Sequence, residues 1–243
     1  MRLLIVNPNT TADVTNMLAE QARRVASAGT EILAVTAPFG VPLIETPAEA
    51  TIAAQAVTQA LAEAPDGIDA GIVGGFIDPG LEAGRDLMPY PLTGLGEASM
   101  FTACLLGARF TVLTGGTRGL APITALAERY GLARRLACVR AIDAELLDVA
   151  ANQEAFRHAL LDRARQTLDQ DPAEVVILGG AVFAGMAEWI RDSMPVPILD
   201  PIHCAVLQAE VLARVRPPQG SPRREERLEP YPDSRRARPG ARP

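Results

Sequence analysis

Two glycine pairs stand where this sequence would be expected to carry chemistry. Gly74-Gly75 follows an apolar run over residues 68–73, and Gly179-Gly180 closes a second run at 174–180, 105 residues further on. Ligands of open parallel sheets bind at the carboxyl ends of the strands. At such a strand-to-helix turn, successive backbone N–H groups can hold an anion such as a carboxylate. The two pairs therefore predict a binding site that offers N–H groups instead of side chains.

Polar residues follow other strand-like runs and complete the predicted binding set. Asn7 and Asn9 come directly after residues 2–6, and Thr114-Gly115 ends the run at 109–114. Amide and hydroxyl groups at these positions could hold a carboxylate or an imide. The predicted substrate-binding residues are Asn7, Asn9, Gly75, Thr114, Gly115 and Gly180.

Three titratable residues are candidates for proton transfer: Asp78, Glu97 and His203. A carboxylate or an imidazole at a cleft can accept a proton from a substrate near neutral pH. Each candidate also has a structural interpretation. Asp78 could cap a helix with Pro79 at its first position, Glu97 could complement a helix dipole, and His203 could be a packed or solvated histidine. The sequence leaves both interpretations open. The second histidine, His158, lies off an apolar face and is predicted to be on the surface.

Other residue types restrict the mechanism and the cellular context. All 23 basic residues are arginine, so lysine Schiff-base chemistry with pyridoxal phosphate and a P-loop are both excluded. The three cysteines Cys104, Cys138 and Cys204 lie far apart without metal-ligand spacing. This spacing predicts no metal site and a reduced, cytoplasmic location. Cys104 and Cys138 are predicted to pack in the interior, whereas Cys204 lies beside His203 and is the thiol to test.

Charge and hydropathy argue against two classes of partner. The net charge of −6 does not favour nucleic acid. No apolar run approaches the ~20 residues of a membrane span, and the first six residues reach Asn7-Pro8 too early for a signal peptide. We expect a small-molecule substrate, with neither nucleic acid nor a membrane as partner, and a homo-oligomer.

The order of the elements predicts an α/β fold made by duplication. Strand-like runs alternate with helical patterns, which indicates parallel strands joined by crossover helices. Thr46, Pro47 and Glu49 mark one helix start, and Thr10 with Asp13 has capping-box spacing at another. Three strands recur in the same order in the second half, each before a polar or glycine-rich turn. The chain is therefore expected to form two pseudo-symmetric lobes with parallel sheets flanked by helices, around a shared cleft.

The expected lobes can be given boundaries. The first covers residues 1–97, completed by a C-terminal helix at about 202–215, and the second covers residues 98–201. Residues 216–243 hold eight Arg, seven Pro and four acidic residues, with Leu228 and Tyr231 as the large apolar groups. This composition cannot form a core and predicts a disordered tail.

Four motifs together resemble the aspartate/glutamate/hydantoin racemase superfamily, in its hydantoin racemase branch. They are Asn7-Pro8-Asn9-Thr10, Asp78-Pro79-Gly80-Leu81, Gly94-Leu95-Gly96-Glu97-Ala98 and Leu178-Gly179-Gly180. The resemblance covers about residues 1–214. It implies two α/β lobes around a cleft, and a cofactor-independent reaction on a small carboxylate, amino-acid derivative or cyclic amide.

The resemblance also shows what this chain lacks. In the family, two cysteines act as bases on opposite faces of the substrate's α-carbon. Motif alignment places glycine at both positions, Gly75 and Gly180. We therefore expect an isomerase-like enzyme without the two-cysteine mechanism. The alternatives are a decarboxylase or lyase that uses the same cleft, and a non-catalytic member that binds a ligand or serves in an assembly.

The composition of the tail leads to a first prediction. Truncation after Val215 should leave the melting temperature and any activity nearly unchanged, because residues 216–243 offer little apolar surface for docking. Thermal denaturation of the full-length and truncated proteins provides the measurement. A melting temperature lower by more than a few degrees would mean that the tail packs on the body or on a neighbouring subunit.

Overall fold

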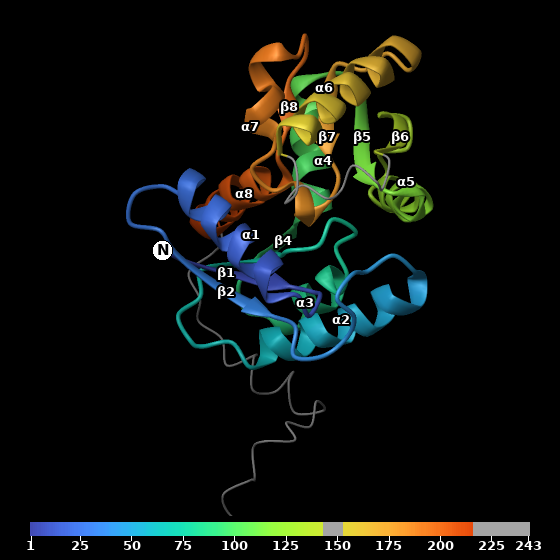
Figure 1. The fold of residues 1–243 in the computed structure, drawn as a ribbon. Coiled ribbons are helices and arrows are strands. Elements are labelled where there is room, and N and C mark those ends of the chain that lie inside the picture. Colours follow the sequence, from blue (N-terminus) through green and yellow to red (C-terminus); the bar gives the residue numbers. More distant parts are fainter. Residues whose placement is uncertain (143–152, 216–243) are drawn as a thin grey trace, which may run out of the picture.

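A computed structural model describes residues 1–142 and 153–215 of the chain. Two α/β lobes stack on one another, the first around β1 to β4 and the second around β5 to β8 (Figure 1). The expected α/β fold of two lobes with parallel sheets is confirmed. The tail at 216–243 lies outside the described residues. Within the described ranges, no helix combines the length and hydrophobicity needed to cross a membrane.

The first lobe contains a four-stranded parallel sheet in the order β2-β1-β3-β4. Strands β1, β3 and β4 are almost entirely buried, which is typical of a parallel sheet covered on both faces, whereas the edge strand β2 is mostly half-buried. The elements are β1 (Arg2–Asn7), α1 (Ala12–Val25), β2 (Glu31–Thr36), α2 (Pro47–Ala62), β3 (Ala70–Val73), α3 (Leu81–Leu87) and β4 (Leu92–Gly94).

The second lobe repeats this arrangement with the order β6-β5-β7-β8. The corresponding strands occupy corresponding places, so the duplication inferred from sequence is present in three dimensions. The elements are β5 (Phe110–Gly115), a 3-10 turn η1 (Thr117–Gly119), α5 (Leu120–Arg129), β6 (Leu136–Ile142), α6 (Gln153–Gln170), β7 (Val175–Leu178), a 3-10 turn η3 (Ala181–Phe183), α7 (Ala187–Ile190), η4 (Arg191–Ser193) and β8 (Ile198–Leu199).

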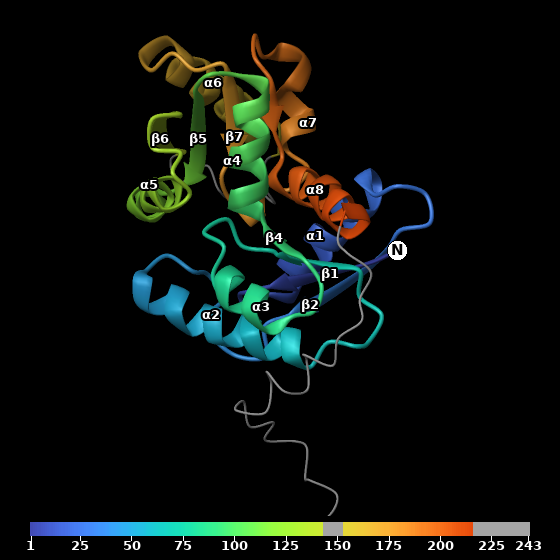
Figure 2. The ribbon, with the colours of Figure 1, turned by 180° about the vertical axis from the view of Figure 1, so that it is seen from behind.

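Two helices cross between the lobes. The helix α4 (Leu95–Leu106) leaves the first sheet and packs against β5 and β7, and α8 (Pro201–Val215) leaves the second sheet and packs against α1, β3 and β4. The two helices lie against each other (Figure 2). Because α4 is continuous from residue 95 to 106, the boundary expected at 97/98 falls inside it. We propose that the lobes divide within α4 and that α8 completes the first lobe.

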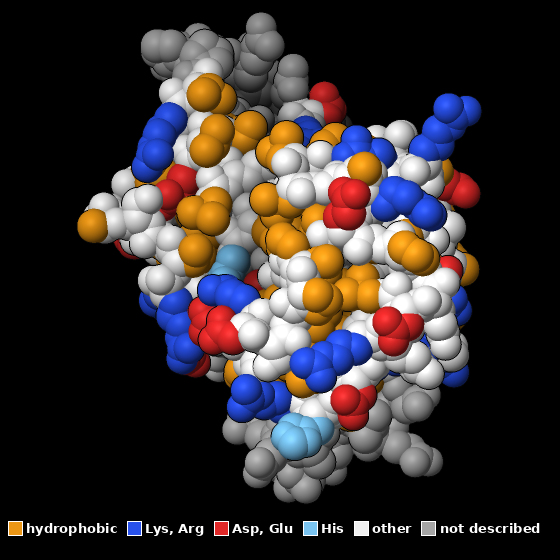
Figure 3. All heavy atoms as spheres, turned by 90° about the horizontal axis from the view of Figure 1, so that it is seen from above, with side chains coloured by type: hydrophobic (Ala, Val, Ile, Leu, Met, Phe, Trp, Pro, Cys, Tyr) orange, Lys and Arg blue, Asp and Glu red, His pale blue; other side chains and the backbone are white. Residues whose placement is uncertain are grey.

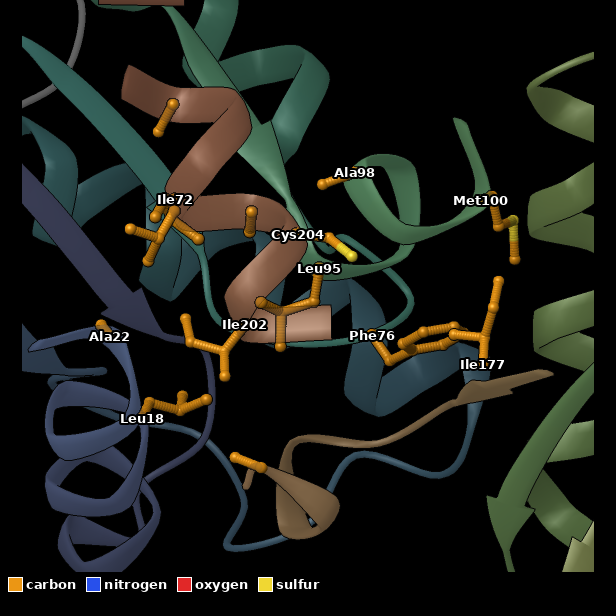
Figure 4. Close-up of a cluster of buried hydrophobic side chains, with 14 of the residues drawn as sticks. Leu18, Ala22, Ile72, Phe76, Leu95, Ala98, Met100, Ile177, Ile202 and Cys204 are labelled. Atoms are coloured by element: carbon orange, nitrogen blue, oxygen red, sulfur yellow. The ribbon is translucent and has the colours of Figure 1, made fainter. Parts of the chain in front are cut away.

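One hydrophobic core joins the lobes. It includes Leu18 and Ile72 from the first lobe, Ile177 from the second, and Ile202 at the start of α8 (Figure 4). Phe76 lies in the same core beside Ile177 (Figure 4) and is 6% exposed. A shared core of this kind fixes the two strand-end edges relative to each other.

Local capping signals were only partly correct. Thr46 accepts from the Glu49 N–H at 3.3 Å, and Glu49 accepts from the Thr46 N–H at 2.8 Å, so the predicted capping box of α2 is confirmed. The box expected from Thr10 and Asp13 is wrong. Helix α1 begins one residue later, with Thr11 as an N-cap whose side chain makes no capping bond.

The surface is charged but carries apolar side chains among the charges. Hydrophobic side chains gather in the middle of one face of the molecule, with arginines and acidic residues around them (Figure 3). Over the described residues, the most exposed large hydrophobic side chains are Leu105 at 88% and Val215 at 70%. His158 is exposed on α6, as predicted.

Candidate active site

The turns after the paired glycines meet between the lobes. Phe76, directly after Gly75, reaches the end of β7, so closely that a Cβ at Gly179 would lie 3.1 Å from its ring. Also between the lobes, Arg118, which follows β5, forms an ion pair with Glu45, which precedes α2, at 2.8 Å. The carboxyl ends of both sheets therefore converge, as ligand sites in parallel sheets require.

Three hydrogen-bonding groups at these strand ends remain free. The Asn9 side-chain oxygen accepts from Asn7 Nδ2 and from the Thr11 N–H, but its Nδ2 has no partner among the described residues. The same holds, within the described chain, for the Thr114 hydroxyl and for the Gly75 N–H. Together they could donate to a carboxylate or to the carbonyl of a cyclic amide.

Two other predicted binding residues, Asn7 and Gly180, form hydrogen bonds within the protein. The two N–H groups of Asn7 Nδ2 are shared among the oxygens of Asn9, Thr11 and Thr15, and Asn7 is fully buried, so it shapes the turn after β1. The Gly180 N–H donates to Leu178 O at 3.0 Å. The predicted anion-binding nest of glycine N–H groups is therefore incomplete, because the Gly180 N–H is bonded within its own turn and cannot donate to a ligand.

The two glycines Gly75 and Gly180 differ in the room available for a side chain. A Cβ at Gly75 would lie 2.6 Å from Pro8 Cγ, so a side chain there requires the proline ring to move. At Gly180 the nearest atom would be on the Phe183 ring at 3.2 Å, a contact that a small shift of the ring relieves. Pro8 therefore packs closely against Gly75, whereas Gly180 has more room.

Asp78 is the most heavily engaged titratable residue of the site. Its carboxylate accepts from the Gly96 N–H at 3.0 Å, the Glu97 N–H at 2.7 Å and the Tyr130 hydroxyl at 2.7 Å. The expectation that Asp78 caps its own helix is wrong, because the N-cap of α3 is Gly80. Asp78 satisfies the N-terminal N–H groups of α4 instead, a helix 17 residues further along the chain.

The environment of Asp78 has the features of a functional carboxyl. The residue is 3% exposed, and burial raises its pKa from 3.8 to about 7, against the lowering effect of its three donors. Its backbone has a φ of +52°, the only positive value for a non-glycine residue in the described chain. A strained backbone and a carboxyl pKa near 7 are both found preferentially at catalytic sites.

The Gly94-Leu95-Gly96-Glu97-Ala98 motif is explained by close approach. A Cβ at Gly94 would lie 2.0 Å from Asp78 Oδ1, and one at Gly96 would lie 2.1 Å from the Phe76 carbonyl oxygen. No side chain fits at either place. The motif therefore provides space for the Asp78 carboxylate at the start of α4.

A groove of about 900 Å³ runs beside Asp78 between α2 and α5. Its lining includes several alanines, among them Ala50 and Ala54 on α2 and Ala125 on α5, together with Asp78 and Tyr130. Such a volume is typical of small-molecule sites. Ion pairs between the lobes lie along it, Glu45 with Arg118 at 2.8 Å and Glu82 with Arg129 at 3.8 Å.

The other proton-transfer candidates are less available. Glu97 accepts from Arg85 and from the Thr93 hydroxyl. His203 has its Nε2 closed to solvent and without a partner among the described residues.

The cysteines resemble packing residues. Cys204 is buried, and burial raises its pKa to about 12, so its thiol stays protonated near neutral pH. Cys104 and Cys138 are half-buried, and Cys138 contacts the Thr111 hydroxyl at 2.9 Å. Over the described residues, no group of three or more His, Cys, Asp or Glu side chains is placed to hold a metal ion.

Tyr130 is a functional candidate that no local sequence pattern indicates. It is the C-cap residue of α5 in the second lobe and donates to Asp78 across 52 positions of the chain. Burial raises its pKa well above the ordinary value, and it therefore remains a hydrogen-bond donor over the physiological pH range. Its bond makes Asp78 a contact between the two lobes.

The fold and these strand ends define a two-lobed α/β protein with a groove between its lobes. Residues 3–209 match the model of the Asp/Glu/hydantoin racemase family, and the chain belongs to this family, in its hydantoin racemase branch. It is 29% identical to a hydantoin racemase from Pseudomonas sp. (strain NS671) over 213 residues, 87% of this chain and 86% of that protein.

Solved structures agree with the family. An allantoin racemase from Pseudomonas fluorescens superposes with a TM-score of 0.84 at 37% identity, covering 88% of this chain and 92% of that one. An allantoin racemase from Klebsiella pneumoniae gives a TM-score of 0.83 at 32% identity, covering 88% of each chain. Membership in this family supports an isomerase-like enzyme with a small-molecule substrate.

The space around the Asp78 carboxylate can be tested with Gly94→Ala. The added methyl group should displace the carboxylate from α4 and lower the free energy of unfolding by several kcal/mol, because buried donors lose their acceptor. Urea denaturation provides the measurement. Gly29→Ala is the comparison, since its Cβ would meet no atom within 4 Å and only a φ of +83° opposes it. Equal losses in both variants would contradict this account.

Asp78 should also make stability depend on pH. Between pH 3.8 and about 7 the folded protein keeps a proton that the unfolded chain releases, so stability falls as pH rises through this window. The full shift corresponds to about 4 kcal/mol. The side chain introduced by Asp78→Asn cannot ionise, so this variant should lack the pH dependence. The loss of free energy of unfolding relative to the parent should therefore be larger at pH 5 than at pH 8. Urea denaturation at pH 5 and pH 8 provides the measurement, with the exposed Asp13→Asn as control. An equal loss of free energy of unfolding at the two pH values would contradict this prediction.

Proposed function

We propose that the protein is a cofactor-independent enzyme that transfers a proton at the α-carbon of a small carboxylate, amino-acid derivative or cyclic amide. The observation that carries the proposal is the buried Asp78 carboxyl, which lines the groove and has its pKa raised to about 7. A general acid or base works best when its pKa lies near the working pH. Relatives named as hydantoin and allantoin racemases support a cyclic amide as substrate.

The binding step uses the free strand-end groups. Asn9 Nδ2, the Gly75 N–H and the Thr114 hydroxyl donate to the carbonyl or carboxylate oxygen next to the reacting carbon. Asn9 and Gly75 lie two residues after β1 and β3, and Thr114 lies near the end of β5, so the sheets place these groups before the substrate arrives. Donors fixed in advance favour the enolate oxygen, where negative charge develops during proton removal.

The chemical step then needs a base and a returning proton. The Asp78 carboxylate takes the proton from the α-carbon, and the electron pair of the broken C–H bond moves into the neighbouring carbonyl to give an enolate. The enolate carbon regains a proton from the Asp78 carboxylic acid or from water. Tyr130 and the first N–H groups of α4 stabilise the carboxylate before it takes the proton and after the proton has been returned.

A lyase is the second candidate. One acid on one face suffices to protonate an enolate that is formed by loss of carbon dioxide. The presence of a single carboxyl with a pKa raised to about 7, among the described residues that line the groove, favours this variant over inversion by two bases. Product analysis separates the two reactions.

The proposal is tested in D2O with hydantoin, 5-substituted hydantoins, allantoin and N-carbamoyl amino acids, followed by NMR. The parent protein should remove α-proton signals faster than buffer does, or release carbon dioxide from a malonate-type acid. Asp78→Asn should lower the rate by about 10²-fold or more, whereas Asn9→Ala and Thr114→Val should mainly raise KM. Asn16→Ala, exposed on α1, is the matched control.

Alkylation tests whether a cysteine, and not Asp78, carries out the reaction. Activity should survive iodoacetamide, because glycine occupies both family cysteine positions and the Cys204 thiol is buried. Loss of activity that bound substrate prevents would assign the reaction to a cysteine. Ligand binding without exchange or product in any assay would overturn the proposal in favour of a non-catalytic binding protein.

A further inference from the structure

A second buried carboxylate, Asp200, ends the second sheet. It follows β8 directly and is 3% exposed. Its Oδ1 accepts from the Ile202 N–H at 3.2 Å, within the first turn of α8, and its Oδ2 accepts from the Gly185 N–H. Since Leu199 pairs with Ile177, Asp200 is level with Leu178, two residues before Gly180.

The bond to Gly185 fixes the turn that carries Gly180. Gly185 has a φ of +84°, and a Cβ there would lie 2.7 Å from the side-chain amide of Gln21, a residue of α1 in the first lobe. The Gly185 peptide is thus held between Gln21 on one side and Asp200 on the other. Residues 180–185 form one short turn, with Phe183 N–H bonded to Gly180 O at 3.1 Å, so displacement of Gly185 moves Gly180 as well.

Asp200 and Asp78 each link a strand-end turn to a crossover helix, one in each lobe. Asp78 lies in the turn after β3 and accepts from the start of α4. Asp200 lies at the start of α8 and accepts from the turn after β7. In each lobe, one buried aspartate therefore connects the turn after a glycine pair to the N-terminus of a crossover helix.

The charged groups around Asp200 fit a structural contact. Burial raises the pKa of this carboxyl, the nearby His203 on α8 lowers it, and exposed Glu188 on α7 raises it. Both oxygens of Asp200 accept from backbone N–H groups, and the bond to the Gly185 N–H connects this carboxyl to the Gly180 turn.

We propose that Asp200 is a positioning residue of the proton-transfer site, which sets the place of the Gly180 turn opposite the Gly75 turn through its bond to the Gly185 N–H. The proposal rests on the function proposed above, because it assigns a role in that reaction. Asparagine retains one acceptor oxygen for Gly185, whereas alanine retains none. A small misplacement of a supporting element can slow a reaction by about 10²-fold.

The kinetic test compares Asp200→Ala, Asp200→Asn and Asp200→Glu with Glu188→Gln as the matched control. Rates are measured well below each melting temperature and divided by the folded fraction. We expect kcat for α-proton exchange to fall about 10²-fold in the alanine variant and less in asparagine and glutamate, with KM nearly unchanged and the pH–rate limb of Asp78 retained. Loss of a pH limb would make Asp200 the acid or base itself, and an unchanged kcat per folded molecule would make it purely structural; both results overturn the proposal.

An NMR measurement separates this proposal from the proposed function. With ¹⁵N-glycine labelling, Asp200→Asn should shift the amide signals of Gly179, Gly180 and Gly185, and leave those of Gly74 and Gly75 in place. Glu188→Gln should shift none of the three. If the parent protein exchanges no probe compound but these shifts appear, the proposed reaction is wrong and the positioning contact stands. Shifts confined to Gly185 would overturn the positioning role, whatever the activity.

Discussion

The hydrogen bonds of the buried Asp78 carboxylate are the interaction on which the site depends. Three donors from two lobes converge on this group: the first N–H groups of α4 and the Tyr130 hydroxyl of α5. Burial opposes its ionisation and the donors favour it, so its pKa comes to lie near 7. A contact that joins the lobes can therefore also exchange a proton.

The rest of the site follows from the space this carboxylate needs. Gly94 and Gly96 exist as glycines because the carboxylate and the Phe76 carbonyl occupy the volume of a side chain. Phe76 in turn fills the core between the sheets and brings the end of β3 against the end of β7. The donors left free at the strand ends, on Asn9, Gly75 and Thr114, are those that neither the turns nor this carboxylate use.

Some local features could be predicted because neighbours along the chain decide them. The capping box of Thr46 and Glu49 forms within four residues, and the strand-helix alternation shows in the apolar pattern. The box expected from Thr10 failed, because side chains of the turn after β1 bond with one another and the helix begins after Thr11. The spacing of Asn7 predicts a substrate-binding residue, but its side-chain amide bonds with Asn9 and Thr15, and these contacts cannot be predicted from spacing.

The sequence by itself determined the two-lobed α/β fold, the duplicated strand order and the glycine pairs at two strand ends, since periodicity and turn residues act over short distances. Only the tertiary structure decided which groups face a ligand. The partners of Asp78 lie 18, 19 and 52 positions away, and Gly185 lies 15 positions from Asp200. Burial, and the choice of donor for a buried carboxylate, depend on packing between segments distant in the chain, and no local pattern carries that information.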